Sequence, residues 1–265
     1  MKKKLCWLKD LLPIGQGMQL APGPHEVHIW WHDHGTGAQP EHNADLLALL
    51  SSDERARCLH LRDEQRQHQF VIGRALCRQV LSRYAPVLPQ DWRFALGPRG
   101  KPAIAGPDLP RPMWFSLSHT NGVSICAVTG VGPEIGVDIE RIDAGRNALE
   151  IAEQFFPDAE AAALRKLPSA RRAEAFVRMW ALKESYVKAR GIGLTEGLSG
   201  MMLDLSSSHE ISVTFANDRQ EQEEHWQFRL LQLDQERIIA LAVFVPSSAP
   251  LLLRAQNWKT CGGVR

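Results

Sequence analysis

Cysteine is scarce in this chain, and its distribution offers no covalent framework. The 265 residues include five cysteines, an odd number, at wide spacings and without a C-x-x-C pair. This pattern argues against a set of disulfide bonds and against a zinc–cysteine site. Reduced, mostly buried thiols are the expected state, which is typical of a cytosolic protein.

Long apolar runs and an intact signal peptide are also missing. No segment approaches the roughly 18 consecutive apolar residues of a membrane span. The chain starts with lysines at positions 2–4, as a signal peptide would, but Asp10 and Pro13 interrupt the segment that follows. We therefore predict a cytoplasmic, soluble protein with no membrane partner.

Neither sign of charge dominates. Lys and Arg number 31 and Asp and Glu number 30, which gives a formal net charge of +1. This balance argues against a protein that binds nucleic acid through bulk positive charge. Hydrophobic residues at 44% and charged residues at 23% argue against a long disordered chain. The length suits one large domain or two domains of roughly 100–150 residues.

Three common signatures of nucleotide and ester chemistry are absent. The sequence has no G-x-x-x-x-G-K-[ST] loop, no G-x-G-x-x-G fingerprint and no G-x-S-x-G elbow. Any phosphate binding is therefore not of the P-loop or Rossmann kind, and no elbow-type hydrolase is indicated. A histidine-rich segment matches no metal motif, because it alternates with apolar residues as a strand does. We predict no metal role for its members, which are His25, His28, His32, Asp33 and His34.

The periodicity of apolar residues predicts two α+β halves of similar size. Alternation predicts a first strand over 26–34, a helix begins after a capping serine at position 51, and a second helix spans 64–84. Asn121-Gly122 predicts a tight hairpin. Further strands are expected at 113–118, 123–128, 135–142, 210–216, 225–233 and 237–245, with a long helical region over 147–190. A Gly/Pro break at 130–133 divides the chain into an N-terminal half (1–132), a C-terminal half (133–246) and an unassigned tail (247–265).

The sharpest local feature is an acidic strand, Ile135-Gly136-Val137-Asp138-Ile139-Glu140. Alternation gives the three apolar side chains one face, and it gives Gly136, Asp138 and Glu140 the other. Two carboxylates on one face suit a hard cation such as Mg²⁺. Gly136 leaves room for a ligand or another backbone. A half-exposed strand with solvated acids is the alternative interpretation.

A second feature is a stripe on the helix that follows. Residues four apart share a helix face, so Phe176, Trp180, Glu184 and Lys188 line up, and Gly191 is placed to end the helix. Glu184 is a candidate third metal ligand or general base, and Lys188 a candidate phosphate contact. The alternative is a surface ion pair worth about 0.3–0.5 kcal/mol.

Basic and polar residues occupy two other segments. Gly100-Lys101-Pro102 forms a turn in which Lys101 can reach a phosphate or a purine ring. Ser118 and His119 end a strand, where His119 can donate a hydrogen bond to an anion. Single residues of these kinds are more often solvated or structural, so each gains meaning only together with the acidic elements.

Together these segments resemble the 4'-phosphopantetheinyl transferases of the surfactin-synthetase-activating type. The resemblance covers roughly residues 26–245 and rests on four blocks in the family's order. The blocks are Gly100-Lys101-Pro102, Phe115-Ser116-Leu117-Ser118-His119, Gly136-Val137-Asp138-Ile139-Glu140, and Trp180-Ala181-Leu182-Lys183-Glu184-Ser185-Tyr186-Val187-Lys188 continuing to Gly191-Ile192-Gly193-Leu194. Glu54-Arg55-Ala56-Arg57 and Gly73-Arg74-Ala75-Leu76 also resemble the family's N-terminal half.

The resemblance implies an α+β monomer of two pseudo-twofold halves, with coenzyme A bound in the cleft between them. It implies Mg²⁺, with Mn²⁺ as a substitute ion, on Asp138, Glu140 and Glu184. Glu184 is further implied as the base and Lys188 as a pyrophosphate contact. The implied coenzyme A contacts are Ser118 and His119 for the phosphates, Lys101 for the adenine side, and Arg55, Arg57 and Arg74 for the 3'-phosphate.

The implied reaction is transfer of 4'-phosphopantetheine to an acyl or peptidyl carrier protein. A serine hydroxyl of the carrier attacks the β-phosphorus of coenzyme A, and 3',5'-ADP leaves. Such chemistry depends on positioning and charge stabilisation, so the enzyme needs no nucleophile of its own. Two alternatives stay open: a non-catalytic module that binds coenzyme A or carrier proteins, and a metal-dependent phosphohydrolase built on the three acidic residues.

Overall fold

Two four-stranded sheets and seven helices organise the part of the chain that the computed structural model describes. That part comprises residues 6–15, 20–35, 43–143, 145, 147–204, 211–216, 223–247 and 249–258. The remainder of the predicted tail, with Cys261, lies outside it. No described helix has the length and apolar character needed to cross a membrane.

The first sheet has the strand order β1-β10-β11-β7 and the second the order β12-β2-β6-β5. Two short hairpins, β3-β4 and β8-β9, lie apart from them. The strands are β1 (Cys6–Trp7), β2 (Glu26–Asp33), β3 (Arg93–Leu96), β4 (Pro102–Gly106), β5 (Trp114–Thr120), β6 (Val123–Thr129), β7 (Ile135–Arg141), β8 (Met201–Asp204), β9 (Ser212–Phe215), β10 (Trp226–Gln232), β11 (Arg237–Phe244) and β12 (Leu252–Asn257).

The helices fall into one group in each half of the chain. The first group is α1 (Asn43–Ala48), α2 (Ser52–Leu59) and α3 (Glu64–Leu81), and the second is α4 (Ala148–Phe155), α5 (Asp158–Lys166), α6 (Ser169–Arg190) and α7 (Leu194–Ser199). The predicted long helical region is three helices, because Pro157 and Pro168 stand at the starts of α5 and α6. Proline at such a position cannot continue the preceding helix.

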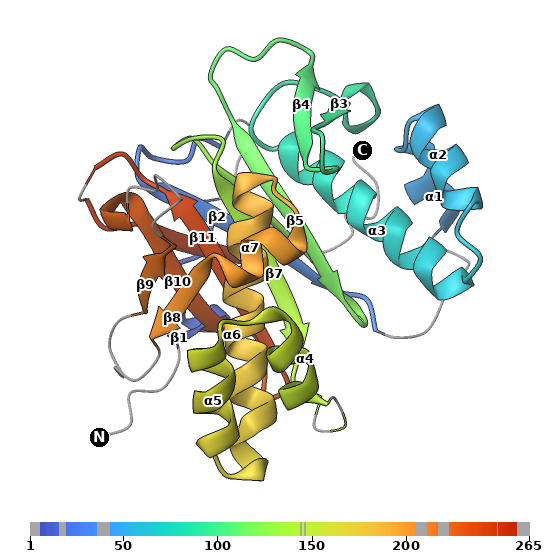
Figure 1. The fold of residues 1–265 in the computed structure, drawn as a ribbon. Helices are drawn as coiled ribbons and strands as arrows, with labels where there is room; N and C mark the ends of the chain where they lie inside the picture. Colours follow the sequence, from blue (N-terminus) through green and yellow to red (C-terminus); the bar gives the residue numbers. More distant parts are fainter. Residues whose placement is uncertain are drawn as a thin grey trace.

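The two sheets share one apolar core, and each carries a long helix on its outer face (Figure 1). Alternate residues of β7 and β6, such as Val137 and Ile125, enter the shared core. The intervening residues of β6, such as Cys126, pack with α3, and those of β11, such as Ala240, pack with α6. Both sheets are therefore buried on two faces, and the prediction of an α+β fold is confirmed.

The ends of the chain are exchanged between the sheets. β12, from the tail that the sequence pattern left unassigned, pairs in parallel with β2 of the N-terminal half. β1, from the N-terminal arm, pairs in parallel with β10 of the C-terminal half. The half boundaries at 132 and 246 stay predictions, but strand pairing crosses them at both ends.

The predicted hairpin at Asn121-Gly122 is confirmed, since it connects β5 to β6. Gly122 has a φ of +79°, and a Cβ there would lie 2.9 Å from backbone atoms of Gly35. The turn therefore requires glycine for its backbone conformation and for the close approach of β2's end. Strands β1, β3, β4, β8 and β12 were not predicted.

Candidate functional site

Asp138 is the centre of the candidate site. It lies on β7 beneath α6 and is only 4% exposed. Its Oδ1 accepts hydrogen bonds from Ser118 Oγ at 2.9 Å and Lys188 Nζ at 2.6 Å. Its Oδ2 is buried without a hydrogen-bond partner. A buried carboxylate oxygen left unpaired is costly, and it is suited to receive a cation.

Gly136 allows α6 to lie directly on β7. A Cβ at this position would come within 1.8 Å of the Ser185 carbonyl oxygen and 2.5 Å of the Ala189 nitrogen. The prediction that this glycine admits another backbone is therefore confirmed. The contact positions the stripe of α6 that carries Glu184 and Lys188 beside Asp138.

Ser118 connects the two halves at the site. Its Oγ donates to Asp138 and accepts from Lys188 Nζ at 2.9 Å and from the Ile139 N–H at 3.3 Å. Two residues earlier, Ser116 Oγ accepts from the Val137 N–H at 3.0 Å. Serine hydroxyls of β5 thus satisfy backbone donors of β7. These hydrogen bonds join the edge strands of two separate sheets. Sequence reasoning missed Ser116, although its spacing from Ser118 places both on one strand face.

Glu184 faces the same group. Burial raises the pKa of its carboxyl, Asp138 raises it further, and Lys188 opposes both effects. The stripe below it is packed: Phe176 is fully buried and its ring lies 5.6 Å from that of Trp180. The interpretation of Glu184 and Lys188 as an isolated surface pair is therefore wrong, because both side chains are coupled to buried Asp138.

Glu140 is half-buried near the end of β7, opposite Ile238 of β11. It lies on the same strand face as Asp138, as the alternation predicts. Among the residues that the structure describes, no group of three or more His, Cys, Asp or Glu side chains is arranged to hold a metal ion. The structure brings Asp138 and Glu184 together, and the three-carboxylate metal set stays a prediction.

His119 connects the acidic centre to the basic residues of the N-terminal half. Its side chain reaches the surface at the end of β5. The pKa of His119 is lowered overall. Burial lowers it most, Lys188 and Arg74 also lower it, and Asp138 opposes them. The charges of Lys188, Asp138 and Arg74 therefore all act on His119, and its role as a phosphate contact stays a prediction.

A pocket of about 230 Å³ adjoins the site. Both halves line it: residues 99–102 and 115–117 from one, and Val187, Lys188 and residues 191–192 from the other. Lys101 is one of these lining residues, but its ammonium is directed at the protein: it donates to the carbonyl oxygens of Pro133 at 2.7 Å and Ala189 at 2.5 Å. Burial lowers the pKa of Lys101 to about 8.

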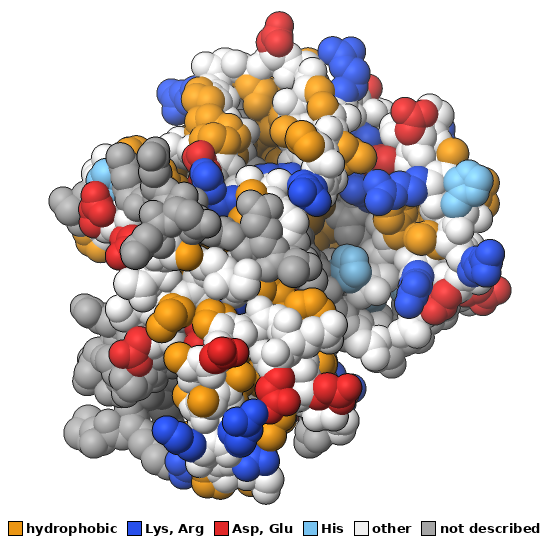
Figure 2. Space-filling model, viewed as in Figure 1, with side chains coloured by type: hydrophobic (Ala, Val, Ile, Leu, Met, Phe, Trp, Pro, Cys, Tyr) orange, Lys and Arg blue, Asp and Glu red, His pale blue; other side chains and the backbone are white. Residues whose placement is uncertain are grey.

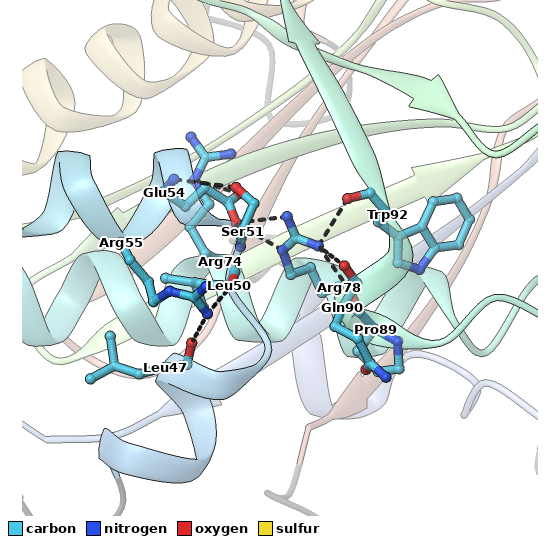
Figure 3. A network of polar contacts seen from close by, with 10 residues as sticks. All are labelled: Leu47, Leu50, Ser51, Glu54, Arg55, Arg74, Arg78, Pro89, Gln90 and Trp92. Atoms are coloured by element: carbon cyan, nitrogen blue, oxygen red, sulfur yellow. Dashed lines mark hydrogen bonds and ion pairs between the residues drawn. The ribbon is translucent and has the colours of Figure 1, made fainter.

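Of the predicted arginines, Arg74 lies beside Glu54 in a polar network of α2 and α3, and Arg55 bonds to backbone carbonyls near it (Figure 3). Glu54 closes a capping box with Ser51 and pairs with Arg78, whose Nη2 lies 2.7 Å from Glu54 Oε2. Arg74 Nε lies 3.9 Å from the other Glu54 oxygen. Sequence reasoning missed Arg78, which is 1% exposed and also donates to three backbone carbonyls, those of Pro89, Gln90 and Trp92.

Arg55 and Arg57 differ in their surroundings. Arg55 Nη1 donates to the Leu50 carbonyl oxygen at 2.7 Å, so this arginine holds the end of α1. Arg57 is exposed in the last turn of α2. Figure 2 shows Lys and Arg side chains gathered across the middle of the face, in the region where Figure 1 draws β5 and α3.

The histidine-rich segment includes His28 and His32 of β2, with His25 and His34 just outside the two ends of that strand. His28 Nδ1 is hydrogen-bonded to Tyr84 Oη at 2.9 Å. The His34 ring lies 5.8 Å from His32 and 5.7 Å from His68 of α3, measured between ring centroids. The cluster packs the end of β2 against α3, which is a structural role.

Residues 134–242 match the family model for the 4'-phosphopantetheinyl transferase superfamily. The chain is 34% identical over 172 residues to the 4'-phosphopantetheinyl transferase HetI of Nostoc sp., a match that covers 64% of this chain and 71% of HetI. It is 31% identical over 173 residues to the 4'-phosphopantetheinyl transferase Sfp of Bacillus subtilis, with 65% and 74% covered.

The matched region contains the acidic strand and the whole of α6. The chain belongs to the 4'-phosphopantetheinyl transferase superfamily. Both the resemblance inferred from the four sequence blocks and the prediction of an enzyme of this class are therefore confirmed.

Proposed function

We propose that this protein transfers 4'-phosphopantetheine from coenzyme A to a serine of an acyl or peptidyl carrier protein. The observation that carries the proposal is the buried pairing of Asp138 with Lys188 and Ser118, beside Glu184 and next to a pocket lined by both halves. Acidic groups for a cation and basic groups for phosphates meet at this one place. Family membership supports coenzyme A as the donor.

The residues present fit a hard divalent cation. Asp138 Oδ2 is buried and lacks a hydrogen bond. Burial and then the charge of Asp138 raise the pKa of Glu184, so a second carboxyl lies within electrostatic reach of the first. Mg²⁺ commonly uses one or two carboxylates and completes its shell with water and phosphate oxygens. Asp138 and Glu184 would hold it, with Glu140 as the third ligand, and Mn²⁺ is the expected substitute. The ion would supply charge neutralisation at the pyrophosphate.

Glu184 is proposed as the base. Its carboxyl lies close enough to the acidic centre for the charge of Asp138 to act on it, and a carboxylate held in place is a common general base. It accepts the proton of the carrier serine, directly or through a held water. The serine oxygen forms a bond to the β-phosphorus, and the bond from that phosphorus to the bridging oxygen breaks, releasing 3',5'-ADP.

Lys188 and His119 are proposed to donate to the phosphate oxygens, where negative charge must be stabilised. Lys188 already contacts the acidic centre, and the charge of Lys188 acts on His119. Arg57 and Arg74 are proposed for the 3'-phosphate. The pocket wall formed by the aliphatic stem of Lys101, whose ammonium is directed at protein carbonyls, is proposed for the adenine side. We further propose a monomer that acts in the cytoplasm.

Mass spectrometry of a carrier protein tests the proposal. Apo acyl and peptidyl carriers are incubated with the protein, coenzyme A and Mg²⁺, and intact masses are recorded. We expect a gain equal to one phosphopantetheine on wild-type incubation and a large loss of rate for Asp138→Asn. No gain on a panel of carriers would refute the proposal. Tight coenzyme A binding without turnover would indicate the binding module, and phosphate release from simple esters the phosphohydrolase.

A further inference from the structure

The C-terminal end of α6 is bonded by a side chain from the opposite half of the molecule. The last carbonyls of a helix lack partners within it. Gly191 ends α6 in the left-handed conformation, with φ +62°, and its N–H donates to the Val187 carbonyl. Lys101 supplies a donor for another of these carbonyls, because its ammonium donates to the Ala189 oxygen. The same ammonium also donates to the Pro133 oxygen, in the connection between β6 and β7.

Side chains of the loop around Lys101 lie next to the turn that follows α6. A Cβ added to Gly191 would lie 3.5 Å from Lys101 Cδ, which is ordinary contact. A Cβ added to Gly193 would lie 3.2 Å from Arg99 Nη1. Two consecutive elements of the C-terminal half, the end of α6 and the turn after it, are thus held by one loop of the N-terminal half.

We propose that Lys101 is a positioning residue that fixes the end of α6, and with it Lys188, against the N-terminal half. Lys188 precedes the bonded carbonyl residue, Ala189, by one position, so a shift of the helix end moves Lys188 relative to Asp138 and Ser118. A cation at a helix C-terminus also interacts favourably with the helix dipole. The role differs from an adenine contact, since the ammonium is directed at protein carbonyls. The proposal rests on the proposed function, because alignment of Lys188 matters for that reaction.

Hydrogen exchange of the full-length protein tests this role together with steady-state kinetics. Lys101→Met keeps the aliphatic stem and removes the ammonium. Lys166→Met is the matched control, since Lys166 is an exposed lysine in the last turn of α5. Exchange is followed at the amides of Gly191 and Ile192, both of which donate to Val187. Should Lys101→Met fail to fold, Lys101→Gln, which is too short to bond both carbonyls, replaces it.

We expect the two amides to exchange about tenfold faster in Lys101→Met, the effect of losing one charge-assisted hydrogen bond. We also expect kcat to fall at least about tenfold with little change in the KM for coenzyme A, because a misplaced helix end affects the reacting geometry. Lys101→Arg should restore part of both, and Lys166→Met should resemble wild type.

Unchanged exchange at these amides, with a raised KM for coenzyme A and weaker binding of 3',5'-ADP, would overturn the proposal in favour of a direct ligand contact. Wild-type protein that transfers nothing would refute the proposed function, whereas the exchange comparison would still decide whether Lys101 holds the helix end.

Discussion

Replacement of Gly136 by alanine tests the contact on which the site depends. The added methyl carbon would lie 1.8 Å from the Ser185 carbonyl oxygen and 2.5 Å from the Ala189 nitrogen, both backbone atoms of α6. Backbone atoms cannot rotate away as a side chain can. Since non-bonded carbon contacts lie near 3.5 Å, β7 and α6 must separate locally by about 1.5 Å.

The expected cost follows from that separation. Overpacking a core typically lowers the free energy of unfolding by about 1–3 kcal/mol, occasionally more. With two rigid contacts, we expect about 3 kcal/mol for Gly136→Ala, or a fall in Tm of about 6 °C or more. Asp138 and Lys188 lie on the two elements that move apart, so transfer should slow by about 100-fold, as for other misplacements near 1 Å.

Thermal unfolding and the carrier mass assay measure both effects. Gly73→Ala is the control, because a Cβ in this α3 position would meet only Ser124 Oγ, at 3.9 Å. Alanine is favoured over glycine within a helix by about 1 kcal/mol, so the control should hold or raise Tm. A Gly136→Ala protein with wild-type Tm and wild-type rate would refute the inferred contact between α6 and β7.

Three further substitutions probe other parts of the structure. Ser118→Ala removes the acceptor of the Ile139 N–H, and urea denaturation should record a loss of about 1–3 kcal/mol; a loss below about 0.5 kcal/mol would contradict the bond. Lys183→Met leaves buried Glu160 without its ion-pair partner, 3.0 Å away, and should cost about 3–5 kcal/mol, most of it recovered by also replacing the glutamate with glutamine. Burial and neighbouring histidines lower the pKa of His34 from 6.5 to about 4. Between pH 6.5 and about pH 4 the unfolded chain therefore binds more protons than the folded chain, so the free energy of unfolding falls as the pH drops through this range. The His34 contribution is at most about 3 kcal/mol; His34→Asn should flatten the pH profile of urea midpoints, and an unchanged slope would refute the assignment.

The acidic strand could be predicted because its information is local. Alternation alone places Asp138 and Gly136 on one face, and the helical spacing alone aligns Glu184 with Lys188. In both segments the local periodicity alone determines which side chains share a face. The sequence pattern does not say which element each face contacts. Only Gly136 indicated that a backbone would approach β7.

Long-range partners could not be predicted. Ser118 contacts Lys188 across 70 positions, and Lys101 contacts Ala189 across 88. Nothing in a turn containing lysine distinguishes a solvated ammonium from one bonded to distant carbonyls. Arg78 was missed for the same reason. Nothing in the sequence of its helix distinguishes it from an exposed arginine, and the carbonyls that it bonds to when buried come from a later segment, at Pro89 and Trp92.

The exchanged end strands determine how the molecule would respond to proteolysis. A cut in the connection at 130–133 would leave one fragment carrying β1, which belongs to the other fragment's sheet, and would separate β2 from its partner β12. Each fragment would retain a strand needed by the other. The nicked protein should therefore persist as a noncovalent complex, and two separately expressed fragments should complement each other more readily than either folds alone.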